Sequence, residues 1–126
     1  GGAVWCNQGA PTLVSCLFVD NWAQRSGGVL HASGTHVIFS ECTLSGNAAP
    51  TGGGIQLTGN SVLLSQTIIA FGNQGAAVHT SPAVITISTC CDVYGNAGGD
   101  WVEALAGQLG INGNISEEPL VVNETT

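Results

Sequence analysis

The stretch SECTLSGN (Ser40 to Asn47) places a cysteine five positions before an asparagine, with a short apolar segment between them. The chain repeats this arrangement as SCLFVDN (15–21) and again as CDVYGN (91–96). A third version, TIIAFGN (67–73), has threonine in place of the cysteine and one extra residue before its asparagine. Recurrence at nearly even intervals is typical of repeat architectures.

Each repeat predicts three short strands. A glycine-rich start precedes an apolar segment, as in GGAVW (1–5), and a second apolar segment follows, as in HVIFSEC (36–42). Alternating apolar residues fit strands, and no helical period fits these segments. Asparagine tolerates the left-handed backbone conformation, so the asparagine that ends each third segment is predicted to form a bend. These turn positions are Asn21, Asn47, Asn73 and Asn96.

The predicted fold is all-β. A repeat of roughly 20 to 26 residues with short strands and polar bends indicates a parallel β-helix, a solenoid in which each repeat makes one coil. At 126 residues the chain is expected to form a single domain of about four to five coils. We assign the repeats to residues 1–96 and a closing coil or cap to residues 97–126.

Stacked coils place equivalent residues above one another in ladders. Aligning the repeats at their bends predicts an inward core ladder of Cys16, Cys42, Thr67 and Cys91. Two further ladders are predicted: Leu13, Phe39, Leu64 and Ile87, and Phe18, Leu44, Ile69 and Val93. The cysteines are interpreted as small buried apolar residues. A disulfide between neighbouring coils, such as Cys16 to Cys42, and a redox role for Cys90 and Cys91 remain open alternatives.

Composition argues against two classes of partner. The chain has one basic side chain, Arg25, against eight carboxylates, which gives a net charge of −7. Binding to nucleic acid depends on lysine and arginine displacing counterions from phosphates, so no nucleic-acid partner is expected. No apolar run approaches the roughly 20 residues of a membrane span, so membrane insertion is not expected either.

The sequence offers no convincing catalytic or metal-binding set, and we predict a protein without enzymatic activity or cofactor. A glycoside hydrolase needs paired carboxylates, but Asp20, Glu41 and Asp92 fall at different places in the repeat. His31 and His79 are expected at equivalent positions two coils apart, with Leu57 between them, too far apart to share a metal. A calcium site at Asp92 and Asp100 has only weak support.

The combination of GGAVWC, PTLVSC and the recurring Gly-Asn bends resembles the right-handed parallel β-helix repeats of large bacterial proteins that are secreted or attached to the cell surface. The segments CDVYGNAGGDW (91–101) and NISEEPL (114–120) resemble the closing part of such domains. Cysteines expected near Ala104 and Val122 are absent. The resemblance implies a right-handed coil and an extracellular or cell-surface location, but no single activity.

The coil ends suggest how the protein could associate. The first strand begins at the start of the sequence, so its edge and the apolar residues beside it are expected to be exposed. The predicted partner is a second copy stacked head to tail, which builds a fibre or surface assembly. The expected contact residues are Val4, Leu13, Phe18, Trp101 and Leu120. The alternative is a carbohydrate-binding or adhesive surface module, with a polysaccharide partner, within a larger secreted protein.

Overall fold

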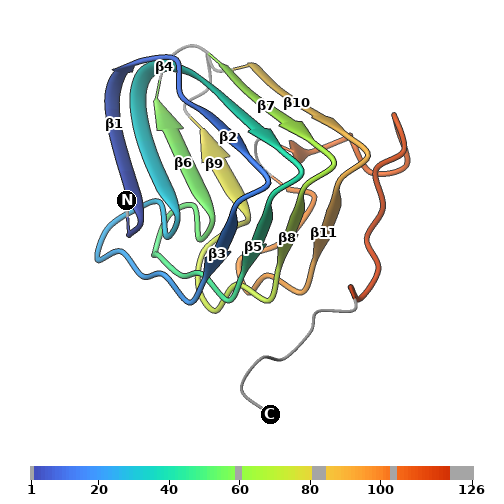
Figure 1. Cartoon of the computed structure of the whole chain (residues 1–126). Coiled ribbons are helices and arrows are strands. Elements are labelled where there is room, and N and C mark those ends of the chain that lie inside the picture. The colour runs from blue at the N-terminus through green and yellow to red at the C-terminus, as the bar shows by residue number, and fades with distance from the viewer. Residues whose placement is uncertain (1, 59–60, 81–84, 103–104, 120–126) are drawn as a thin grey trace.

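The computed structural model describes residues 2–58, 61–80, 85–102 and 105–119. These residues form a coil of parallel strands, so the predicted all-β solenoid is confirmed (Figure 1). The strands are β1 (Val4–Gly9), β2 (Thr12–Val14), β3 (Leu17–Val19), β4 (Leu30–Ser40), β5 (Thr43–Ser45), β6 (Ile55–Thr58), β7 (Ser61–Ser65), β8 (Ile68–Ala70), β9 (Val78–Thr80), β10 (Ile85–Thr89) and β11 (Asp92–Tyr94).

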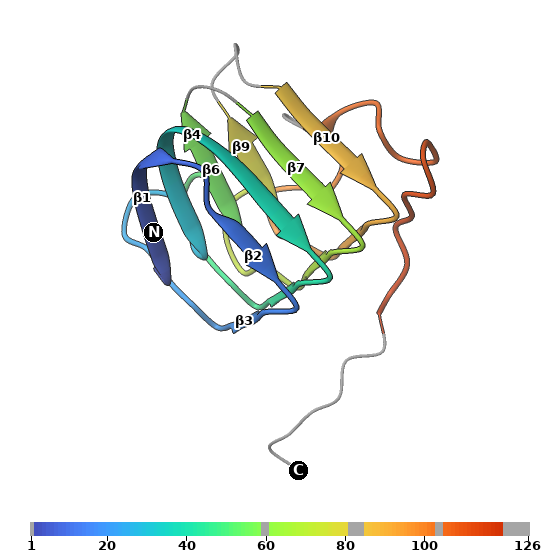
Figure 2. The ribbon, with the colours of Figure 1, turned by 45° about the horizontal axis from the view of Figure 1, so that its top comes forward.

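The strands stack on three faces of the coil (Figures 1 and 2). The first face holds β1, the first half of β4, β6 and β9, and the second holds β2, the second half of β4, β7 and β10. The third face holds β3, β5, β8 and β11. We call the stacked layers rungs 1 to 4. Rung 1 consists of β1 to β3, rung 2 of β4 and β5, rung 3 of β6 to β8, and rung 4 of β9 to β11. They make about three turns, fewer than the four to five coils predicted.

Strand register confirms most of the predicted ladders. Phe18, Leu44, Ile69 and Val93 lie opposite one another on the third face. On the second face Leu13, Phe39 and Leu64 are also in register, as predicted. The fourth member of that ladder was predicted wrongly: Ser88, and not Ile87, lies opposite Leu64.

Two columns of left-handed residues form the bends. Ser15, Glu41, Gln66 and Cys90 all have a positive φ, between 49° and 56°. Each follows a strand of the second face and precedes one member of the cysteine–threonine ladder. The second column comes after the third face and consists of Asp20, Gly46, Phe71 and Gly95. The left-handed conformation costs an L-residue roughly 1 kcal/mol, which the stacked rungs must offset.

The core fills the inside of the coil. Phe39 on β4 is fully buried and packs edge to face against Phe18, with ring centroids 6.3 Å apart. Other fully buried side chains come from all three faces, including Leu30, Leu44, Ile55, Leu57 and Leu64. Alternation along each strand therefore sends one set of residues into a continuous core and the other set outward.

The two ends of the coil differ. After β11, the described residues 97–102 and 105–119 do not form a further strand but lie against the end of rung 4 (Figure 1). Leu105 from this segment is fully buried in the core, and Trp101 packs against it. At the other end, the core residues of rung 1, among them Val4, Leu13 and Phe18, are only partly buried. Rung 4 is thus covered, whereas rung 1 forms the open end of the described chain.

Candidate functional site

Buried asparagines join neighbouring rungs at one corner. The Asn47 Oδ1 accepts hydrogen bonds from the backbone and side-chain nitrogens of Asn21, and its Nδ2 donates to the Phe18 carbonyl at 3.0 Å. Asn96 acts in the same way on the preceding rung: its Oδ1 accepts from the Gly72 N–H at 2.9 Å, and its Nδ2 donates to the Ile69 carbonyl at 3.0 Å. These predicted turn asparagines are structural links between rungs.

Asn73, the remaining predicted turn position, lies in the bend but does not share this buried arrangement. Its side chain is exposed, and Gly72 occupies the place that corresponds to Asn47. A Cβ atom on Gly72 would lie 2.7 Å from the Asn96 Oδ1, so a larger residue here would require the Asn96 side chain to shift. The extra residue of the TIIAFGN stretch therefore moves its asparagine outward.

Cys16, Cys42, Thr67 and Cys91, the residues of the predicted core ladder, occupy equivalent positions on successive rungs. Backbone hydrogen bonds connect each position to the next rung, because the residue after each ladder member donates to the ladder member of the preceding rung. The Thr43 N–H donates to the Cys16 carbonyl, the Ile68 N–H to the Cys42 carbonyl and the Asp92 N–H to the Thr67 carbonyl. Each thiol or hydroxyl donates to the carbonyl two residues earlier, at 2.9 to 3.4 Å. Threonine and cysteine thus play the same local role.

The ladder members differ in their access to solvent. Cys42, Thr67 and Cys91 are buried, whereas Cys16 on rung 1 is only half-buried. Burial raises the pKa of the Cys42 and Cys91 thiols, because the charged thiolate loses hydration there. All five cysteines of the chain have free thiols.

The described histidines and carboxylates lie at separate places in the coil. The register places Gln56, and not Leu57 as predicted, between His31 and His79. The Asp100 carboxylate accepts hydrogen bonds from Gly95 and Asn96, and Asp92 accepts one from the Glu117 N–H. Within the described ranges, no group of three or more His, Cys, Asp or Glu side chains is placed to hold a metal ion.

The open edge of rung 1 is the most distinctive surface of the molecule. Among the described residues, β1 and β2 pair only with β4, and β3 pairs only with β5. Their other edges present backbone donors and acceptors that can pair with a further strand. Of the predicted contact residues, Val4, Leu13 and Phe18 lie at this end, Trp101 packs against the core from residues 97–119, and Leu120 lies outside the described residues.

An apolar rim surrounds this edge. Outward positions of rung 1 carry large apolar side chains that are 48 to 66% exposed: Trp5, Val14, Leu17, Val19 and Trp22. The register gives their counterparts on rung 2, which are smaller or more polar: His31, Ser40, Thr43, Ser45 and Ala48. Our sequence reasoning missed this rim because it followed only the inward positions. Comparison of the outward positions across the aligned repeats would have found it.

The opposite end offers much less strand edge. Gln108 and Asn114 take the place of a further strand beside β10 and the bend after it. The Gln108 Oε1 accepts from the Ser88 N–H at 2.8 Å, while the Asn114 side chain accepts from the Cys91 N–H and donates to the Ser88 carbonyl. A bridge between Asp92 and Ile115 continues this cover on the third face. Side-chain amides thus satisfy backbone groups that a neighbouring strand would otherwise bind.

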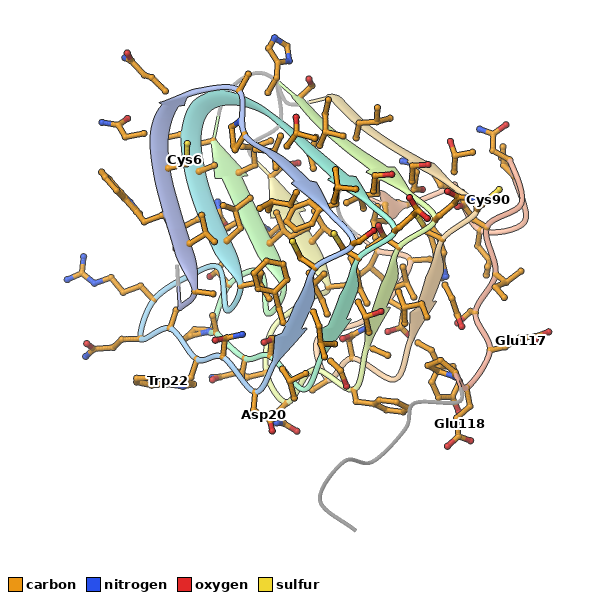
Figure 3. All side chains as sticks on the ribbon, in the orientation of Figure 1. Cys6, Asp20, Trp22, Cys90, Glu117 and Glu118 are labelled. Atoms are coloured by element: carbon orange, nitrogen blue, oxygen red, sulfur yellow. The ribbon has the colours of Figure 1, made fainter. Side chains whose placement is uncertain are left out.

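Charge also separates the two ends. Figure 3 shows Asp20 and Trp22 near rung 1, and Glu117 and Glu118 at the far end of the coil. Arg25, the one basic residue, follows Trp22 and is exposed. The end that carries the apolar rim is therefore the less acidic of the two.

No family model, curated protein or solved structure matches this chain. The described part of the chain also contains no helix with the length and apolar character needed to cross a membrane. A proposal of function therefore rests on the surface features of the structure itself, above all those of rung 1.

Proposed function

We propose that this protein is a non-catalytic structural β-solenoid that works outside the cell or at its surface and associates with itself end to end through rung 1. The observation that carries the proposal is the apolar rim of rung 1, whose strands pair on one side within the described residues. Exposed apolar patches of this kind mark interaction sites. An exposed edge that is also apolar is a strong template for pairing with another chain.

A second copy can cover this surface. Contact with a neighbouring rung reduces the exposure of outward positions, since Thr43 and Ala48, the rung 2 counterparts of Leu17 and Trp22, are half-buried and buried. A second molecule can cover both edge and rim. Full burial of a Val or Leu side chain contributes roughly 1.5 to 3 kcal/mol, so the rim can supply a useful part of the binding free energy. The low charge near rung 1 also reduces repulsion between copies.

The covered C-terminal end favours contact between two copies of rung 1. In such a dimer, a two-fold axis passes through the middle of β1. Each β1 then pairs with the β1 of the other molecule, and each β2 pairs with the β3 of the other molecule. All of these pairs are antiparallel. β2 and β3 each have three residues, so their edges match in length. Such a contact uses the same patch twice and closes as a dimer. Head-to-tail stacking would instead produce a growing fibre, in which the covered end must accept a strand.

Sedimentation velocity of the whole chain over a range of concentrations tests the proposal. We expect a dimer, and we expect Leu17→Asp to convert it to a monomer. Leu109→Asp is the matched control, because Leu109 is also about half exposed but belongs to the C-terminal segment. This control should remain a dimer. A monomeric wild-type protein at high concentration would refute self-association, and loss of assembly in both variants would point to head-to-tail fibres instead.

A specific observation supports a second candidate, a carbohydrate-binding module. Trp5 and Trp22 are the most exposed aromatic residues among the large apolar side chains, and indole rings stack well on sugar rings. A glycan array probed with the wild-type chain and with Trp22→Ala separates the two candidates. Binding that depends on Trp22 in a monomeric protein would favour this candidate over self-association.

A further inference from the structure

The geometry points to an oxidation site at Cys16 and Cys42, where a disulfide can join rung 1 to rung 2. This inference does not depend on the proposed self-association. The two cysteines occupy the same inward corner position on neighbouring rungs, as the hydrogen bond from the Thr43 N–H to the Cys16 carbonyl shows. Adjacent strands lie about 4.8 Å apart, and disulfides join Cα atoms about 4.4 to 6.8 Å apart.

The Cys42 thiol extends toward rung 1. The Cys42 Sγ donates to the Leu13 carbonyl at 3.2 Å, so this sulfur reaches from rung 2 into rung 1. The Cys16 Sγ donates to the Val14 carbonyl at 3.3 Å, next to the Leu13 residue that the Cys42 thiol contacts. Bond formation therefore requires a small local movement and no exchange of strands.

The remaining cysteines lack such a partner. Thr67 follows Cys42 in the ladder, so Cys91 is two rungs away, at roughly 9 to 10 Å, beyond disulfide reach. Cys6 lies on the first face in register with Ala32. Cys90 is exposed at the left-handed bend before the ladder position. Across the five cysteines, one pair occupies neighbouring positions of one ladder.

Rung 1 can also make the movement that the bond needs. Disulfides prefer Cβ atoms about 3.5 to 4.5 Å apart, slightly closer than in-register strands normally hold them. A movement of rung 1 toward rung 2 closes this gap and keeps the hydrogen bonds between the two rungs.

The chemistry proceeds by two exchanges with a small-molecule disulfide such as oxidised glutathione. The half-buried Cys16 thiolate attacks one sulfur of the oxidant, which forms a mixed disulfide and releases one glutathione thiolate. The Cys42 thiolate then attacks the Cys16 sulfur, forms the Cys16–Cys42 bond and releases the second glutathione. Both cysteine protons go to solvent, and the oxidant takes up the two electrons. Because burial raises the pKa of Cys42, the second exchange should become faster as pH rises.

A single tryptic site makes the test simple. Arg25 is the one residue after which trypsin can cut, and cleavage separates Cys16 from Cys42. The whole chain is incubated with oxidised glutathione, its remaining thiols are alkylated, and it is digested under denaturing, non-reducing conditions. We expect residues 1–25 and 26–126 to stay linked until dithiothreitol is added. The linked chain should melt roughly 5 to 10 °C higher than the reduced chain.

Matched variants identify the bond. Cys16→Ser and Cys42→Thr should both release the fragments, and the threonine variant should still fold because Thr67 occupies the equivalent position on the next rung. Cys6→Ser and Cys91→Ser should leave the fragments linked. The inference fails if the wild-type fragments separate, if Cys16 keeps its glutathione adduct, or if Cys6→Ser releases them. A link between two molecules, seen as a mass of two chains, would also overturn it.

Discussion

Substitution of Asn96 offers the sharpest test of how the rungs are joined. In Asn96→Ala, the Gly72 N–H loses its acceptor and the Ile69 carbonyl loses its donor, and both of these hydrogen bonds are buried. A buried backbone group without a partner costs about 1 to 3 kcal/mol. We therefore expect the free energy of unfolding to fall by about 2 to 5 kcal/mol. Asp100 would still bind the backbone at Gly95 and Asn96, so the turn itself should persist.

Asn73 supplies the matched control, since it is the same residue type in the corresponding stretch of the preceding repeat. Its exposed side chain makes one hydrogen bond, of 3.4 Å, to the Gly46 carbonyl. Asn73→Ala should therefore cost less than about 0.5 kcal/mol, as for most surface substitutions. Urea denaturation followed by tryptophan fluorescence measures both variants. Equal losses in the two variants would refute the register described above and would restore Asn73 to the asparagine series.

Two further predictions concern the core and the response to pH. Phe39→Ala should lower the free energy of unfolding by about 3 to 5 kcal/mol because Phe39 is fully buried. Phe18→Ala should lower it clearly less because Phe18 is only partly buried on rung 1. Urea denaturation measures both losses, and the opposite order would contradict an open rung 1. Desolvation lowers the pKa of His31, so protonation favours the unfolded chain and stability should fall as pH drops below about 6.5. His31→Gln should lose less thermal stability between pH 7.5 and pH 5 than the wild type, and an unchanged loss would exclude His31 as a cause.

The residues that point into the core could be predicted because each lies a fixed number of residues before a bend. Every strand that ends at a bend carries its inward residue at a fixed distance from that bend, so Cys16, Cys42 and Phe39 could be placed from the repeat alone. The same spacing places Ser88 opposite Leu64. We predicted Ile87 instead because an apolar residue was expected in the core. Ser88 is satisfied there by Gln108 and Asn114, which lie in a segment that has no repeat and so could not be aligned.

Other features depend on local backbone geometry. The sequence shows an extra residue before Asn73, but only the structure shows that Gly72 takes the inward place. The repeat also continues in composition beyond Asn96, which led to an overestimate of the number of coils. The described residues 97–102 and 105–119 instead close the end of rung 4 with turns and side-chain amides, and such a segment has no sequence period to detect.

The extra residue at Gly72 and Asn73 has a consequence for the evolution and engineering of this chain. Rung 3 holds one more residue at this corner than rung 2, yet the bridges from Trp22 to Ala48 and from Ala48 to Gln74 continue past it. Added length is therefore looped out toward solvent while the stack on both sides keeps its alignment. The corner can tolerate insertions, so a peptide epitope or a recognition loop grafted between Gly72 and Gln74 should be displayed without disturbing the fold.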